Sequence, residues 1–98
     1  MSNAAAILAA CNDVPAEGRF ADDKVFIHAA FAQFEDAAEQ GWTLAEFKAE
    51  CIALHLAGEL TLSRLDMVGL FSAEMVTASN TRHPHFPAIV WNFIRVDR

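Results

Sequence analysis

The chain has 98 residues, a hydrophobic fraction of 54% and a formal net charge of −6. This length fits one domain with a modest core, and the hydrophobic fraction argues against intrinsic disorder. The sequence holds no apolar run near the ~20 residues that a membrane span needs. The two cysteines, Cys11 and Cys51, are too few for a disulfide framework, which favours a reducing, cytoplasmic setting.

The charge is distributed unevenly along the chain. Residues 1–60 carry three Lys or Arg against ten Asp or Glu, a balance of −7, whereas residues 61–98 carry four Arg against three acids. An acidic protein repels nucleic acid at long range. Contacts with a phosphate backbone would therefore have to come from the C-terminal third of the chain.

The first predicted element is a short helix over residues 4–11, with Asn3 as its N-cap. It ends in LAAC, which has the form of a lipoprotein cleavage site. The basic n-region and the longer apolar stretch of such a signal are missing, so the helix is the better interpretation. A loop follows, in which Pro15 and Gly18 act as breakers.

A longer helix is predicted from Asp22 to Gln40, with Gly41 in the C′ position. Its apolar residues recur at helical spacing and would form one buried face. This face comprises Ile27, Phe31, Phe34 and Ala38, and it is widened by Phe26 and Ala30.

The start of the next helix carries a strong local signal. Thr43 and Glu46 have the spacing of a capping box, and Trp42 and Phe47 have the spacing of a hydrophobic staple. These residues predict a helix that begins after Thr43 and stops at Gly58. Its core stripe would be Leu44, Phe47, Cys51 and Leu54.

The hydrophobic period changes from 3.6 to 2 at residues 59–64, where Leu60 and Leu62 would face the core. A short helix capped by Ser72 follows, and residues 88–96, AIVWNFIRV, have the β-branched and aromatic content of a strand. This strand can pair antiparallel with residues 60–64. The sequence therefore predicts a small α+β domain with three to four helices and a two- or three-stranded antiparallel hairpin.

The order of these elements resembles a winged helix-turn-helix domain. Residues 43–64, TLAEFKAECIALHLAGELTLSR, look like its last helix running into the first wing strand, and residues 88–96 look like the returning strand. The resemblance covers about residues 22–96 and is a superfamily-level pattern. Winged helices commonly bind DNA, and many serve as protein-interaction modules.

The resemblance implies that residues 44–57 occupy the place of the recognition helix and that residues 65–88 form an unusually long wing. It is compatible with a single domain over residues 1–98. The parts of that domain would be an N-terminal helix and loop (1–21), a helical core (22–58) and a wing hairpin with an inserted short helix (59–98).

The cysteine and histidine residues are the candidates for metal binding and catalysis. Cys51 and His55 lie one helical turn apart, and His83 and His85 could add two further zinc ligands. Cys51 also fits the core stripe, and the short paired-cysteine spacing of zinc sites is missing. A reactive thiolate would need an open, electropositive site, and no phosphate loop or serine elbow occurs. We therefore predict a non-enzyme with no metal and no cofactor.

The basic residues of the C-terminal third could form a nucleic-acid contact on the wing. They are Arg64, Arg82, His83, His85, Arg95 and Arg98. The alternative is that these residues balance an acidic body and keep a sheet edge soluble. The predicted recognition helix offers two acids against one lysine, which places DNA binding second.

Residues 88–96 are apolar on both faces of the predicted strand. A domain this small is not expected to cover both faces, so one is predicted to bind a partner. The predicted partner-binding residues are Trp91, Phe93, Ile89 and Phe86.

The leading functional hypothesis is a non-catalytic protein-interaction module, either within a larger bacterial-type assembly or as a homodimer. A second hypothesis is a DNA-binding regulator that contacts DNA through its basic wing. A third is an acidic inhibitor of a nucleic-acid-binding protein, which the balance of −7 over residues 1–60 suggests.

Overall fold

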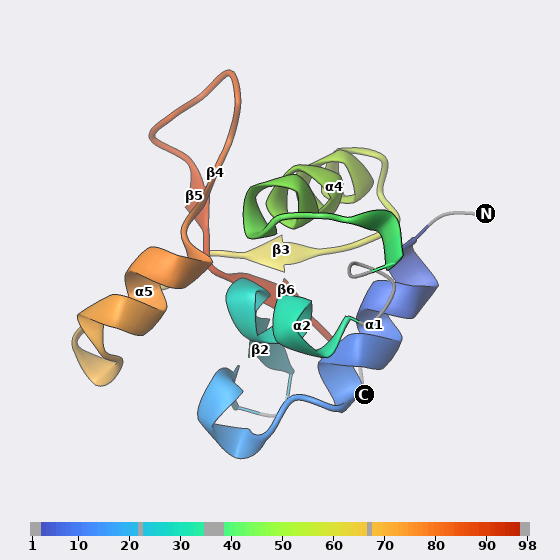
Figure 1. Cartoon of the computed structure of the whole chain (residues 1–98). Helices are drawn as coiled ribbons and strands as arrows, with labels where there is room; N and C mark the ends of the chain where they lie inside the picture. The colour runs from blue at the N-terminus through green and yellow to red at the C-terminus, as the bar shows by residue number, and fades with distance from the viewer. Residues whose placement is uncertain (1–2, 22, 35–38, 67, 97–98) are drawn as a thin grey trace.

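The computed structural model describes residues 3–21, 23–34, 39–66 and 68–96, which form an α+β fold (Figure 1). The helices are α1 (Ala4–Asn12), α2 (Ile27–Gln33), α4 (Leu44–Leu56) and α5 (Ala73–Ser79), with 3-10 turns at Ala16–Gly18 and Val68–Leu70. The strands are β1 (Arg19–Phe20), β2 (Lys24–Phe26), β3 (Leu62–Ser63), β4 (Thr81–Arg82), β5 (Val90–Trp91) and β6 (Phe93–Arg95).

Strands β1, β2, β6 and β3 form an antiparallel sheet in that order, and β4 and β5 form a separate hairpin. Ile94 of β6 lies opposite Val25 of β2 on one side and opposite Leu62 of β3 on the other. The predicted antiparallel pairing of the C-terminal strand with residues 60–64 is confirmed. The sheet is larger than the predicted hairpin because β1 and β2 also join it.

Two buried clusters cover the two faces of the sheet. On one face, α1, α2 and α4 contribute Ile7, Cys11, Ile27, Ala30, Phe47, Cys51 and Leu54, which pack with Val25, Leu62 and Ile94 of the strands. On the other face, the rings of Phe20, Phe26, Phe71 and Phe93 contact one another at centroid distances of 4.7 to 6.2 Å.

The prediction of a long helix that starts at Asp22 is wrong for the first part of that segment. Residues 24–26 form strand β2, and α2 begins only at Ile27, whose N–H donates to the carbonyl of Asn92 (3.0 Å). Val25, Phe26 and Ile27 are all fully buried, and such an apolar run fits a buried strand as well as a helix. Pairing with β6, which is distant in sequence, decides between them.

The second half of the predicted helix is interrupted at Phe34, whose ψ of 92° lies outside the helical range. Phe34 is buried and Phe31 is half-buried, as the stripe predicts, while Ala38 lies outside the described residues. Gly41 has φ +70°, the left-handed conformation expected at the C′ position. The predicted helical core over residues 22–58 therefore contains a strand and a break.

Helix α1 is confirmed, but its expected N-cap is not. Asn3 has helical backbone angles and makes no side-chain cap. Its side-chain amide donates instead to Glu50 of α4 (3.1 Å). At the other end of α1, the Arg19 guanidinium donates to the carbonyls of Cys11 and Val14, where a cation complements the helix dipole.

Helix α4 begins and ends where its local signals predict. The Glu46 N–H donates to the Thr43 hydroxyl (3.2 Å) and the Thr43 N–H donates to the Glu46 carboxylate (3.0 Å), which completes the capping box. Trp42 and Phe47 both pack on the ring of Phe34, with centroids 5.9 and 5.5 Å away. Gly58 follows the helix with φ +80°.

The insertion, residues 64–91, joins β3 to β6 and contains α5 and the β4–β5 hairpin (Figure 1). Ser72 caps α5 as predicted, because its hydroxyl accepts from the N–H of Met75 (3.2 Å). The side chain of Asn92 donates to Ser79 (2.9 Å) and Asn80 (2.8 Å), which fixes the end of α5 to the sheet.

The expectation that one face of residues 88–96 lies open is wrong. Trp91 and Phe93 are 7% and 1% exposed, and Ile94 is fully buried. The chain changes sheets at Asn92, so Trp91 packs against His55 of α4 while Phe93 enters the aromatic cluster. Phe71 of the insertion covers the second face, a contact between segments far apart in the sequence.

Candidate functional site

The β4–β5 hairpin, residues 81–91, projects from the body beside α4 (Figure 1); we call it the wing, and the loop between its two strands the wing tip. The Nδ1 atom of His83 accepts hydrogen bonds from the backbone N–H groups of His85 (3.0 Å) and Phe86 (3.1 Å). A histidine side chain thereby closes the turn from inside. The tip has a defined shape before it contacts anything.

Further hydrogen bonds close the base of the same turn. The Arg82 guanidinium donates to the carbonyl of Pro87 (2.7 Å), the His83 N–H donates to the carbonyl of Ile89 (2.9 Å), and the Ile89 N–H donates to the carbonyl of Phe86 (2.9 Å). Phe86 is 61% exposed despite this order. A large apolar side chain held out on an ordered tip is a feature of binding surfaces.

A row of aromatic rings connects this tip to α4. The ring of Trp91 lies 4.9 Å from that of His55 and 5.7 Å from that of His83, and His83 lies 5.0 Å from Phe86. Trp91 is buried between the two histidines, so it supports the wing rather than offering a surface to a partner. Of the four predicted partner-binding residues, Phe86 is exposed, Ile89 is half-buried, and Trp91 and Phe93 are buried.

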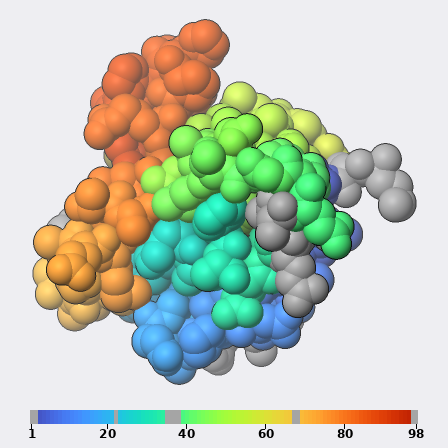
Figure 2. All heavy atoms as spheres, in the orientation of Figure 1, coloured from blue at the N-terminus to red at the C-terminus, as the bar shows by residue number. Residues whose placement is uncertain are grey.

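The outward face of α4 lies next to the wing, as the space-filling view shows (Figure 2). This face is apolar, although it points to solvent. It consists of the exposed residues Ala45, Ala49, Ala53 and Leu56 and the half-buried Ile52. Leu56 is 61% exposed. These residues lie opposite the core stripe, so α4 is apolar on two sides.

The single lysine of α4 is turned away from this face. Lys48 donates from Nζ to the carbonyl of Asn80 (2.8 Å), at the junction between α5 and the wing. Burial lowers the pKa of Lys48. The acids of α4 flank the other side of the helix, where Glu46 is exposed and Glu50 accepts from Asn3. Glu59 is exposed just beyond the C-terminal end.

The structure does not bring the predicted basic residues into one patch. Arg82 and His85 are exposed on the wing, and Arg64 is exposed at the end of β3. Arg95 lies on β6, where its guanidinium pairs with Asp23 of the acidic body (3.8 Å). Arg98 lies outside the described residues.

Three of the four candidate zinc ligands, Cys51, His55 and His83, have other roles, and His85 is exposed on the wing. Cys51 is fully buried, and burial raises the pKa of its thiol to about 12. The Nδ1 atom of His55 accepts from the Leu62 N–H (3.1 Å), which covers a donor on the edge strand β3. His83 is engaged in the wing turn, and Trp91 separates it from His55. Across the described ranges, no group of three or more His, Cys, Asp or Glu is arranged to hold a metal ion.

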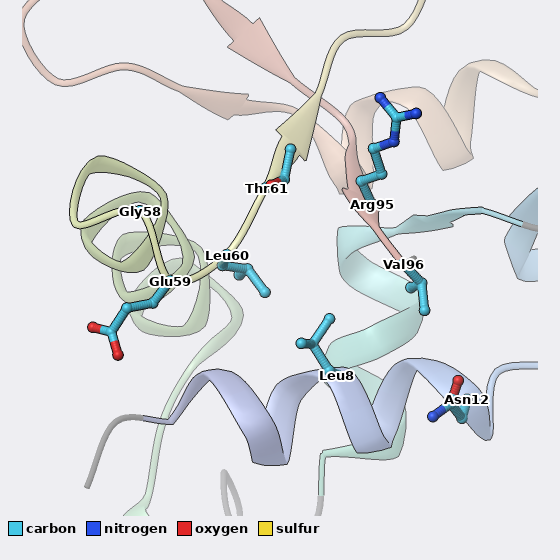
Figure 3. Close-up of a pocket in the computed structure, with 8 residues that line it drawn as sticks. All are labelled: Leu8, Asn12, Gly58, Glu59, Leu60, Thr61, Arg95 and Val96. Carbon is cyan, nitrogen blue, oxygen red and sulfur yellow. The ribbon is translucent and has the colours of Figure 1, made fainter. Parts of the chain in front are cut away.

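A cavity of about 380 Å³ lies between α1 and the start of β3 (Figure 3). Its lining residues are Leu8, Asn12, Gly58, Glu59, Leu60, Thr61, Arg95 and Val96. Leu8, Leu60 and Val96 form an apolar floor, while the carboxylate of Glu59 points away from it. The Arg95 guanidinium pairs with Asp23, and the other polar side chains of the lining are those of Asn12, Glu59 and Thr61.

No family model, curated protein or solved structure matches this chain. Within the described part of the chain, no helix combines the length and apolar character that crossing a bilayer requires. The function of the chain must therefore be inferred from the surface of α4 and the wing. Sequence reasoning missed the α4 face, although alanines at i, i+4 and i+8 opposite a core stripe are a readable signal.

Proposed function

We propose that this chain is a winged-helix protein-interaction module without catalytic activity, which binds a protein through the outward face of α4 and the adjacent wing. A cytoplasmic setting is part of the proposal, based on the two free, buried cysteines. The observation that carries the proposal is the composition of the α4 face. The helix in the recognition position displays alanines and Leu56 to solvent, and its one lysine is engaged elsewhere.

The order of elements supports the winged-helix part of the proposal. Helix α4 passes through Gly58 directly into β3, and β3 pairs antiparallel with β6 after a projecting hairpin. Residues 44–57 then occupy the recognition-helix position, and the β4–β5 hairpin of the insertion corresponds to the wing. This placement puts the α4 face and the wing tip on the surface that a winged helix uses for binding.

The chemistry of that surface favours protein over DNA. Reading DNA requires donors and acceptors that reach base edges, and cations that reach phosphates. The alanine and leucine side chains on the exposed face of α4 provide neither hydrogen-bonding groups nor cations. Arg82 already donates to Pro87, and Arg95 is paired with Asp23. Exposed apolar groups beside an ordered aromatic tip instead match the core of a protein interface.

DNA binding through the wing is the second candidate, favoured by the exposure of Arg82 and His85 on a projecting hairpin. With Arg64 as a further cation, such a wing would make about three phosphate contacts. Each contact contributes about −0.9 to the log–log salt slope, so the slope would be no steeper than about −3.

The test compares variants at exposed positions in a pull-down from nuclease-treated lysate of the native host. Ala49→Arg and Phe86→Glu change the proposed surface, whereas Ala9→Arg places the same arginine on the exposed side of α1. We expect the wild type and Ala9→Arg to retain the same partner, and the two surface variants to lose it. Fluorescence anisotropy on a random duplex and a selected-sequence pool is expected to give weak binding. Nanomolar, sequence-selective binding that is lost in Arg82→Glu would show instead that the chain is a DNA-binding protein.

A further inference from the structure

The α4 face is built to receive another helix. Ala45, Ala49 and Ala53 recur every fourth residue along its exposed side and form a stripe, called the alanine track, which is continued at the C-terminal end by the exposed Leu56 and bordered by the half-buried Ile52. Helix axes approach most closely where the contact residues are small, at about 8 Å.

The two flanks of the track differ in chemistry. On the wing side, α4 contacts the insertion through Lys48 and His55, and the ring of His55 is linked through Trp91 and His83 to the exposed Phe86 at the wing tip. On the opposite side, Glu46 is exposed and Glu50 lies half-buried beside α1, and the exposed Glu59 follows at the C-terminal end. The alanine track therefore has aromatic rings along one flank and carboxylates along the other.

This asymmetry defines the chemistry of the occupant. We infer that the partner segment is an amphipathic helix whose apolar stripe packs on the alanine track and whose Lys or Arg residues line one flank, opposite Glu46 and Glu59. Lys48 cannot neutralise these acids because its Nζ is bound to the carbonyl of Asn80. A basic flank on the partner satisfies them, and opposite charges at the rim also speed association. The inference rests on the proposed function, because it names the partner of the same surface.

A second copy of this chain is a poorer occupant. Packing two α4 faces together would bring like carboxylates into the same interface, in a protein of net charge −6. Duplex DNA is opposed by the same acids. The wing tip is already ordered by His83, so the partner helix meets Phe86 in a fixed position and little entropy is lost in ordering that side chain.

The experiment uses the full chain and two synthetic helical peptides of about 18 residues that share one Leu/Ala stripe. One peptide carries Lys along a single flank, and the other carries Glu at the same positions. We expect the Lys-flanked peptide to bind at least ~10-fold more tightly by titration calorimetry, with an advantage that shrinks as salt rises. Ala49→Arg should abolish this binding, and Glu59→Lys, which leaves the capping box of α4 intact, should reduce the preference for the Lys-flanked peptide.

Matched controls are Ala9→Arg on α1 and Glu17→Lys in the loop after it, both at exposed positions. Circular dichroism and the unfolding midpoint check that every variant folds. Equal binding of the two peptides, preference for the Glu-flanked peptide, or binding that Ala49→Arg leaves intact would overturn the inference. Absence of peptide binding, or self-association in light scattering that Ala49→Arg abolishes, would overturn it too. The proposed function would still stand if host-lysate capture depended on Ala49 and Phe86.

Discussion

The body and the insertion of this molecule are held in place by different interactions. In the body, α1, α2 and α4 bury apolar side chains against one face of the sheet. The insertion has two aromatic anchors, Phe71 and Trp91, and a polar junction in which Asn92, Ser79, Asn80 and Lys48 are joined by hydrogen bonds. Hydrogen bonds contribute less net free energy than the burial of large apolar groups. The insertion should therefore open at lower free energy than the body.

This difference suits the two regions to separate tasks. The body fixes the direction of α4 through its fully buried stripe residues Phe47 and Cys51. The insertion carries the wing, whose tip is ordered by its own hydrogen bonds and whose junction is polar. The proposed surface spans both regions. A substitution in the buried body should therefore mainly lower folding stability, whereas a substitution at the exposed wing tip should mainly weaken binding.

The largest expected effect comes from Phe47→Ala in the body. Phe47 is fully buried, and its ring contacts those of Phe31 and Phe34. Removing it should lower the free energy of unfolding by about 3–5 kcal/mol, through lost burial and the cavity left behind. Denaturant titration followed by Trp fluorescence and far-UV circular dichroism measures this change. The control is Phe86→Ala, which removes the same side chain from an exposed site and should change stability by less than about 0.5 kcal/mol. Similar losses for the two variants would contradict the division into body and insertion.

The next effect is expected from Asn92→Ala at the junction. Asn92 is buried, and its amide donates to Ser79, Asn80 and the carbonyl of Val76. Loss of these bonds removes the donor that joins Ser79 and Asn80 to the sheet, at a cost of about 1–3 kcal/mol. Hydrogen exchange should become faster in α5 while α1 keeps its protection. The exposed Thr77→Ala on α5 is the matched control. Uniformly faster exchange in both helices would show that the junction belongs to the body's cooperative unit.

Local signals predicted α4 and the edge of the sheet well. The capping box of Thr43 and Glu46 and the alternation of Leu60 and Leu62 involve residues close in sequence, so their physics is readable without the fold. Strand β2 was missed because a run of three buried apolar residues suits either helix or strand until β6 pairs with it.

The candidate site was predicted only in part, for a related reason. Phe86 was expected at the surface and is exposed, but Trp91 and Phe93 are covered by His55 and Phe71, which come from distant segments. The covering of a strand face depends on such long-range packing, which spacing along the chain does not report. The α4 face was overlooked because a single alanine fits a buried and an exposed helix position equally well, and its spacing becomes informative only when it is set against the core stripe on the opposite side.

A smaller effect is expected from Thr43→Ala at the start of α4. The Thr43 hydroxyl accepts from the Glu46 N–H, so its removal leaves one helix-end donor without its protein acceptor. The expected loss is about 1 kcal/mol in the free energy of unfolding, which denaturant titration can resolve. Thr43→Ser keeps the hydroxyl and should retain most of the stability. A loss of stability in Thr43→Ser that equals the loss in Thr43→Ala would show that the cap is not the reason.

The smallest effect concerns pH and compares a histidine of the body with one of the wing. Burial lowers the pKa of His28 below the ordinary histidine value of 6.5, and the nearby positive charge of Lys48 adds to this effect. The unfolded chain therefore takes up a proton at this residue before the folded chain does. The stability linked to His28 is complete above about pH 6.5 and is lost as the pH falls through the lowered pKa. His28→Gln should flatten the fall in unfolding free energy between pH 7 and pH 5. His85→Gln, at an exposed position on the wing, is the control. If both variants keep the wild-type pH profile, another group governs acid stability and the polar atoms of His28 are solvated in the fold.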